Sequence, residues 1–97
     1  MLHQLPDVTG TGAAVALSAT PVRVNWVKIQ TNSKVHTNSS VVRVGDASVS
    51  ATQGMVVDVN DSKDVNPASA TNTFDLSQTY ALIQTGDVIQ VSYNQVV

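Results

Sequence analysis

The stretch PVRVNWVKIQ (21–30) indicates the fold class, because its apolar and polar side chains alternate with a period of two. Val22, Val24 and Trp26 fall on one side of this run, with polar residues between them. A period of two is typical of a β-strand, in which successive side chains point to opposite faces of a sheet. After Trp26 the alternation shifts by one residue, so that Val27 and Ile29 are the next apolar pair. Such a slip predicts a β-bulge inside the strand.

Several other runs of the chain predict strands. The same alternation occurs in VVRV (41–44), GMVVDV (54–59) and DVIQVSY (87–93). β-branched side chains, which suit a pleated sheet, are abundant in this chain, whereas good helix formers are few. Turn-forming residues separate the runs at short intervals, as in TGTG (9–12), VNDSKD (59–64) and TGD (85–87).

Many short strands at this spacing predict an all-β chain with little or no helix. We expect a single compact antiparallel β-sandwich, jelly-roll-like in its connections, or a small barrel. SVVRVGDASVS (40–50) is interpreted as a strand, a turn at Gly45–Asp46 and a second strand, with the Asp46 side chain bonding downstream amides. DLSQTY (75–80) is the one candidate for a helical or 3₁₀ turn, with Asp75 or Ser77 as its cap.

A chain of 97 residues supports one domain at most. We expect residues 1–10 to form an N-terminal arm and residues 11–97 to form the single β-sandwich domain. Leu2, His3 and Leu5 of this arm are candidates for contact with a partner protein or with a neighbouring copy of the chain. The alternative is a frayed terminus. An edge strand and the loops 31–40 and 60–72 are further candidate contacts.

The composition argues against several classes of function. Charged residues make up 12% of the chain, the net charge is −2 and the five cations are scattered, so we expect no nucleic-acid binding. No apolar run of 18 residues is present, so we expect no membrane partner. The first ten residues show no basic region followed by an apolar block, so no signal peptide is expected. A surface so poor in charge is weakly protected against association, which suggests that partners cover much of it.

No residue pattern indicates catalysis or a cofactor. The chain has no Cys, and His3 and His36 are isolated, so we expect no zinc site and no nucleophilic triad. Asp58, Asn60, Asp61 and Asp64 lie close together in sequence and could ligate calcium. They lack the spacing of a known calcium loop, and an acidic turn remains the alternative. We therefore expect a protein that is not an enzyme.

Trp26 is the only tryptophan, and it lies in the longest predicted strand. We expect it to be a core anchor, whose replacement by Ala would cost about 3–5 kcal/mol. The alternative is an anchor at an interface. A third hypothesis is a small carbohydrate-binding β-sandwich module, which would need aromatic side chains exposed on one face.

The order of these parts resembles that of small β-sandwich structural proteins of tailed bacteriophages, of the capsid decoration or cement type. The resemblance rests on a VxVGD element at Val42–Asp46, on Gly54 entering the next strand, on Asp75–Tyr80 and on the hairpin at Thr85–Asp87. It covers roughly residues 20–94. It rests on strands, turns and spacing, and it carries over no site residue.

The resemblance implies a structural protein of the virion, made in the cytoplasm of the host bacterium. It would bind the major capsid protein on the outer surface of the head and stabilise the shell, most often as a homotrimer. The alternative within the same class is a module of a tail or head fibre that contacts the host surface. Neither role involves catalysis or a cofactor.

Overall fold

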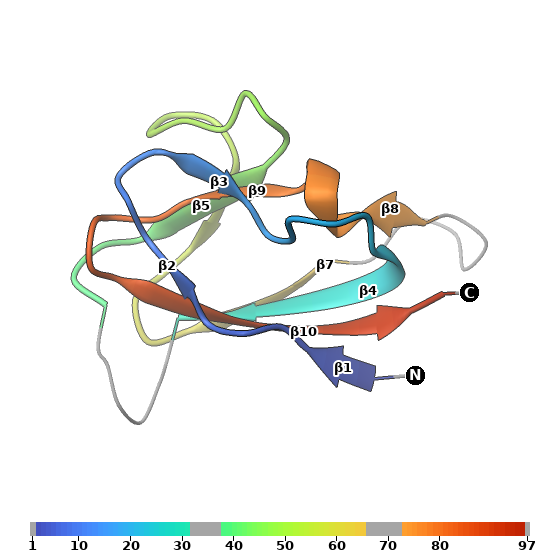
Figure 1. The fold of residues 1–97 in the computed structure, drawn as a ribbon. Helices are drawn as coiled ribbons and strands as arrows, with labels where there is room; N and C mark the ends of the chain where they lie inside the picture. The colour runs from blue at the N-terminus through green and yellow to red at the C-terminus, as the bar shows by residue number, and fades with distance from the viewer. Residues whose placement is uncertain (1, 32–37, 66–72, 97) are drawn as a thin grey trace.

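The computed structural model describes residues 2–31, 38–65 and 73–96, and these residues form two antiparallel sheets packed face to face (Figure 1). The predicted all-β sandwich is confirmed. The two sheets share no strand, so the arrangement is a sandwich and not a closed barrel. Neither sheet is interrupted by an α-helix in the part of the chain that is described, and no helix there is long and apolar enough to cross a membrane.

The larger sheet has six strands and is built around two long neighbours, β4 and β10. Its path runs β1-β10-β4-β7, while β2 also pairs with β10 and β8 also pairs with β4. The strands are β1 (Leu2–Gln4), β2 (Val8–Thr9), β4 (Arg23–Gln30), β7 (Ser62–Val65), β8 (Phe74–Asp75) and β10 (Val88–Gln95).

The smaller sheet has four strands in the order β3-β9-β5-β6. These are β3 (Ala14–Ala16), β5 (Val42–Gly45), β6 (Met55–Val57) and β9 (Tyr80–Leu82). In Figure 1 this sheet forms the upper layer and the six-stranded sheet the lower one. The strands β6 and β7 both lie at edges of their sheets, and the chain passes from one sheet to the other between them.

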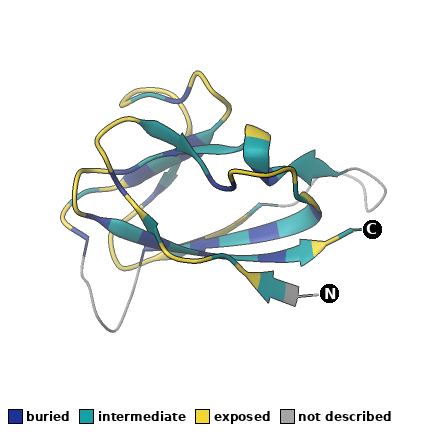
Figure 2. Cartoon of the chain, viewed as in Figure 1, coloured by how far each residue is buried: buried dark blue, intermediate teal, exposed yellow. Residues whose placement is uncertain are grey.

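The core lies between the sheets and consists almost entirely of aliphatic side chains from alternate positions of the strands. Figure 2 shows the alternation of buried and half-buried residues along β4 and β10. The buried cluster comprises Leu17, Val24, Val27, Ile29, Val42, Val44, Val57, Leu76, Ala81, Ile83, Ile89, Val91 and Tyr93. Because the chain has no disulfide, burial of these side chains is the main stabilising contribution.

The predicted bulge is present in β4, but it lies before Trp26 and not after it. Trp26 opposes Asn94 of β10 whereas Val24 opposes Gln95, so Asn25 is the extra residue. The Asn94 side-chain Nδ2 donates to Asn25 Oδ1 at 2.8 Å across this bulge. Because the bulge comes before Trp26, the Trp26 side chain points away from those of Val24 and Val27 and lies outside the buried cluster.

The expectation that Trp26 anchors the core is therefore wrong. Its side chain is half-buried, and it belongs neither to the cluster of buried residues nor to the apolar residues packed against that cluster. The core of β4 is instead made by Val24, Val27 and Ile29, each with 0% exposure.

The N-terminal segment is part of the sandwich and not a separate arm. Strand β1 pairs with β10 through Leu2 opposite Asn94, so that both ends of the chain lie at the same end of the larger sheet (Figure 1). The Leu5 N–H donates to the Val91 carbonyl oxygen at 2.9 Å. Leu5 and Val8 pack against the core. The expected boundary at residue 10 is thus not a structural boundary, because β10 needs partners along both of its edges.

The 3₁₀ turn η1 (Leu76–Gln78) confirms the prediction for DLSQTY, with Asp75 as its cap. The Asp75 carboxylate accepts hydrogen bonds from the Ser77 N–H at 2.9 Å and from the Ser77 hydroxyl at 2.8 Å. It also accepts from the Val22 N–H at 3.1 Å, which ties the turn to the start of β4. Leu76, the first residue of the turn, is fully buried.

The stretch 40–50 is only partly as predicted. Strand β5 forms, and the Asp46 carboxylate accepts from the Ser48 N–H at 2.8 Å, as expected of an aspartate in a turn. No second strand follows directly, because residues 46–54 make a longer connection with a single bridge between Ser50 and Gln53. The partner of β5 in this hairpin is β6.

Candidate interaction surface

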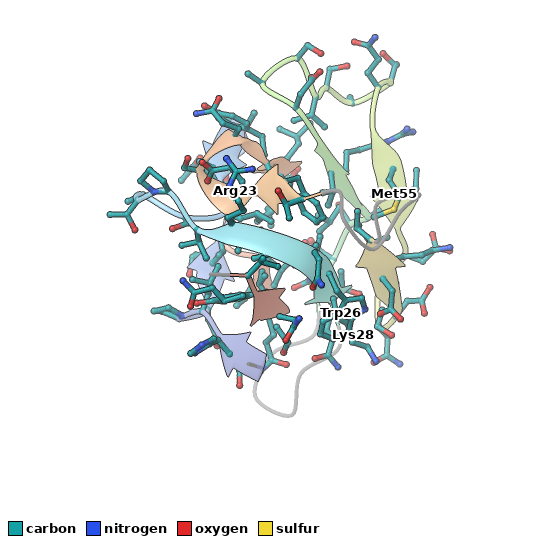
Figure 3. All side chains as sticks on the ribbon, turned by 90° about the vertical axis from the view of Figure 1, so that its right-hand side faces the viewer. Arg23, Trp26, Lys28 and Met55 are labelled. Carbon is teal, nitrogen blue, oxygen red and sulfur yellow. The ribbon has the colours of Figure 1, made fainter. Side chains whose placement is uncertain are left out.

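The two sheets present outward faces of opposite character. Across the six-stranded sheet, one outward row is formed by Gln4, Ser92, Lys28 and Asp64, which oppose one another from β1 to β7. Trp26 lies two positions before Lys28 on the same face of β4, and Figure 3 shows these two side chains close together. This face is mainly polar, although Trp26 and Val88 also lie on it, and it is suited to contact with water.

The outward face of the four-stranded sheet is mainly apolar. The register places Ala14 of β3, Leu82 of β9, Arg43 of β5 and Val56 of β6 in one row across the sheet. Ala16 and Tyr80 form the row beside it, which reaches Gly45 of β5. Val41 lies just before β5, two residues before Arg43 and so on the opposite side of the Arg43 row, with 43% exposure. A face of this kind on a small domain is typical of a surface that another molecule covers.

Arg43 is the one charged residue in these rows, and its bonding capacity is only partly used. Its Nη1 donates to the Gly54 carbonyl oxygen at 3.1 Å, which lays the guanidinium over the beginning of β6. Its Nε is buried and has no hydrogen-bond partner. Among the described residues, no hydrogen bond joins this guanidinium to a carboxylate. An arginine can donate five N–H groups, so a partner carboxylate would find donors here.

The β5–β6 connection folds back against this same face. Val49 is buried but lies outside the main core cluster, and it packs beside Gly45 and Gly54. Gly54 has a φ of +126°, and a Cβ there would lie 2.6 Å from the Val49 side chain. Only glycine fits this position without displacing its neighbours.

A shallow groove of about 280 Å³ opens between the two sheets on the side of β6 and β7. Its apolar walls are the side chains of Val44, Met55 and Val65, with Gln78 and Thr79 at one end. Figure 3 shows Met55 on β6 above β7. This groove is open and holds no cluster of titratable groups, so it offers apolar contact and no evident chemistry.

The buried polar groups on the other side of the sandwich hold the chain in place. Asp87 has 4% exposure and accepts hydrogen bonds from the N–H groups of Ser39 and Ser40 at 3.0 and 3.1 Å. Asn38 Oδ1 accepts from the Val88 N–H at 2.9 Å. These bonds join the segment before β5 to the segment before β10, which is a structural role.

The residues predicted to make contacts lie in or directly beside the larger sheet. His3 stacks on Tyr93 with a ring separation of 5.3 Å, and Leu5 packs on the core. Leu2 pairs through its backbone with Asn94. Trp26 lies on the outward polar face. None of these backbone positions belongs to the apolar face around Arg43.

The acidic residues considered for calcium do not converge in the described part of the chain, where no three acidic or histidine residues come together as a metal site. Asp61 has a structural role through its backbone, because its N–H donates to Thr31 Oγ1 at 2.9 Å. His36 and most of the predicted contact loops, residues 32–37 and 66–72, lie outside the described residues.

Comparison of the chain with family models, with curated proteins and with solved structures found no match.

The apolar face around Arg43 was not predicted from the sequence, although the alternation within each strand was visible there. In VVRV, Val41 and Arg43 alternate with the core residues, and Val56 alternates with Met55 and Val57. Only the register between strands brings these positions together with Leu82 and Ala14.

Proposed function

We propose that this chain is a non-catalytic structural protein of a bacteriophage particle, which decorates the outer surface of the head and stabilises the shell. The major capsid protein would be its partner, and neither nucleic acid nor membrane would take part. The observation that carries the proposal is the apolar outward face of the four-stranded sheet around Arg43. The resemblance in the order of strands and turns supports it independently.

The mechanism of stabilisation would be mass action. A protein that binds the assembled lattice, but not its separated subunits, stabilises the lattice by its binding free energy. The strands of this sheet have only three or four residues each, so its face is small. It gives a weak single contact, because stable interfaces bury roughly 800 Å² on each partner. Many copies on a repeating lattice, or several sites joined in one oligomer, would raise the overall affinity through avidity.

A carbohydrate-binding module is the second candidate, and one observation favours it. Trp26 is half-buried on the outward polar face, beside Asn94 across the bulge. Aromatic rings flanked by amide side chains can bind sugars. Titration of Trp26 fluorescence with a panel of soluble oligosaccharides tests this candidate. A saturable change would favour it over the capsid role.

The direct test of the proposal is immunogold electron microscopy on phage particles from a culture that produces this chain. Label spread over the head would support a decoration protein. The expected companion result is that heads stripped of the protein break at a lower temperature than decorated heads. Label confined to the tail would favour a fibre module that contacts the host, and absence of label from particles would overturn both roles.

A further inference from the structure

Strand β6 is a short edge strand that carries neither a charged residue nor a proline to oppose pairing. In the described part of the chain it pairs with β5 on one side only. The segment from Gly54 to Val57 has no charged residue and no proline. The neighbouring edge strand β7 carries Lys63 and Asp64, and charged residues on an edge oppose pairing with another chain. β6 is therefore open to pairing where β7 is protected.

Opposite charges lie at the two ends of this strand. At its beginning, the Arg43 guanidinium is held over Gly54 by the hydrogen bond from Nη1 to the Gly54 carbonyl oxygen. At its end, the exposed Asp58 follows Val57. The Thr31 hydroxyl donates to the Asp58 carbonyl oxygen at 2.5 Å, which fixes the backbone there. The strand thus has a cation over the residue that precedes it and an anion on the residue that follows it.

We propose that β6 pairs with β6 of a second copy of this chain, antiparallel, around a two-fold axis at Val56. In this register Gly54 opposes Asp58 of the second copy, and Met55 opposes Val57. Directly opposed residues have Cα atoms about 4.5–5.5 Å apart. The Asp58 carboxylate would then reach the Arg43 guanidinium that lies over Gly54, and symmetry would form this ion pair twice.

The charges select this register among those that the sheet permits. A shift by one residue in pairing would place core-facing residues opposite outward-facing ones, which is unfavourable. An axis at Met55 keeps the faces matched, but Asp58 would then oppose Thr52. An axis at Val57 also keeps the faces matched, but Asp58 would then oppose Val56. Only the axis at Val56 combines matched faces with the ion pair. The other edge of the same sheet, β3, consists of Ala14–Ala16 and offers no charge to complement Arg43.

The paired copies would share a continuous eight-stranded sheet whose outward apolar rows are joined at Val56. A two-fold contact produces a dimer or a larger even-numbered assembly, and not the trimer implied by the resemblance. The inference does not depend on the capsid role, because it concerns the isolated chain. A chain that dimerises without binding phage heads would contradict the proposed function alone.

Sedimentation velocity over a concentration series tests the pairing. The wild-type chain is expected to pass from the 10.2 kDa monomer to a species of twice that mass. Asp58→Arg is expected to weaken the dimer roughly tenfold or more, because symmetry removes the ion pair twice and replaces it by repulsion. The matched control is Asp7→Arg, which makes the same charge change at an exposed residue between β1 and β2 and should leave the dimer unchanged.

The double exchange Arg43→Asp with Asp58→Arg keeps the pair with its charges reversed, and is expected to restore dimerisation relative to Asp58→Arg. Circular dichroism on each variant confirms that the sandwich has formed. The inference is overturned if the wild type stays monomeric or forms only trimers. It is also overturned if Asp58→Arg dimerises as well as Asp7→Arg.

Discussion

The N–H and the hydroxyl of Ser39 both donate to the carboxylate of Asp87, at 3.0 and 3.2 Å. The two residues are 48 positions apart in the sequence, and Asp87 is almost fully buried. A buried carboxylate is costly unless hydrogen bonds compensate it. This contact therefore fixes the entry into β5 against the entry into β10.

Replacement of Asp87 by Ala is expected to lower the free energy of unfolding by about 2–3 kcal/mol, because the N–H groups of Ser39 and Ser40 lose their acceptor. Chemical denaturation followed by circular dichroism measures the change. Ser39→Ala is the matched control, since it removes the hydroxyl but keeps the backbone donor, and it should cost less than half as much. Equal losses in the two variants would contradict this account.

Deletion of residues 1–8 is expected to destabilise the fold by roughly 3 kcal/mol, because Leu5 and Val8 leave the core and β10 loses its pairing along one edge. That is a large fraction of the stability of a small domain. Thermal unfolding of the truncated chain measures the effect. A melting temperature equal to that of the full chain would restore the interpretation of this segment as a separate arm.

Trp26→Ala is expected to cost less than about 2 kcal/mol, because the side chain is half-buried and lies outside the core cluster. Ile29→Ala on the same strand is the comparison, and its full burial predicts a loss of about 2–5 kcal/mol. Urea unfolding of both variants gives the two values. If the tryptophan variant proves the less stable of the pair, the outward placement of Trp26 is wrong.

The stabilising contribution of Asp75 is expected to depend on pH. The hydrogen bond from the Ser77 N–H, followed by those from the Ser77 hydroxyl and the Val22 N–H, lowers the pKa of this carboxyl from its ordinary value of 3.8. A carboxyl with a lowered pKa in the folded state stabilises the fold above the pKa of the unfolded state. The contribution is therefore present above about pH 5, and it is lost as the pH falls below 3.8 through the lowered value.

Comparison of the wild type with Asp75→Asn tests this pH dependence. The wild type should be the more stable protein near pH 6, and the difference should narrow as the pH falls towards about 2. Thermal unfolding at several pH values provides the measurement. A difference that stays constant over this range would show that the charge of Asp75 contributes nothing.

The local pattern of the sequence predicted the strands well where one face of a strand is buried. The alternation in 21–30 and 87–93 reflects a sheet with a core on one side, so the periodicity is a direct consequence of burial. The Asp75 cap and the Asp46 turn were predictable for a similar reason. Both side chains bond within two residues, and such contacts do not depend on the rest of the fold.

Trp26 and the N-terminal segment were wrongly predicted because both depend on pairing between distant strands. The bulge could be recognised from the slip of the alternation, but its position is fixed by β10, where Asn94 opposes Trp26. Likewise, nothing within MLHQL shows that β10 has an unpaired edge for it.

The sequence by itself determined that this chain forms short antiparallel strands with a thin aliphatic core, since alternation and turn residues act over a few positions. Only the tertiary structure decided which outward residues share a surface. Arg43, Val56 and Leu82 come from three strands, and the register between strands, which is a long-range property, places them in one row. The same register leaves β6 at an edge, with Arg43 over the residue before the strand and Asp58 directly after it.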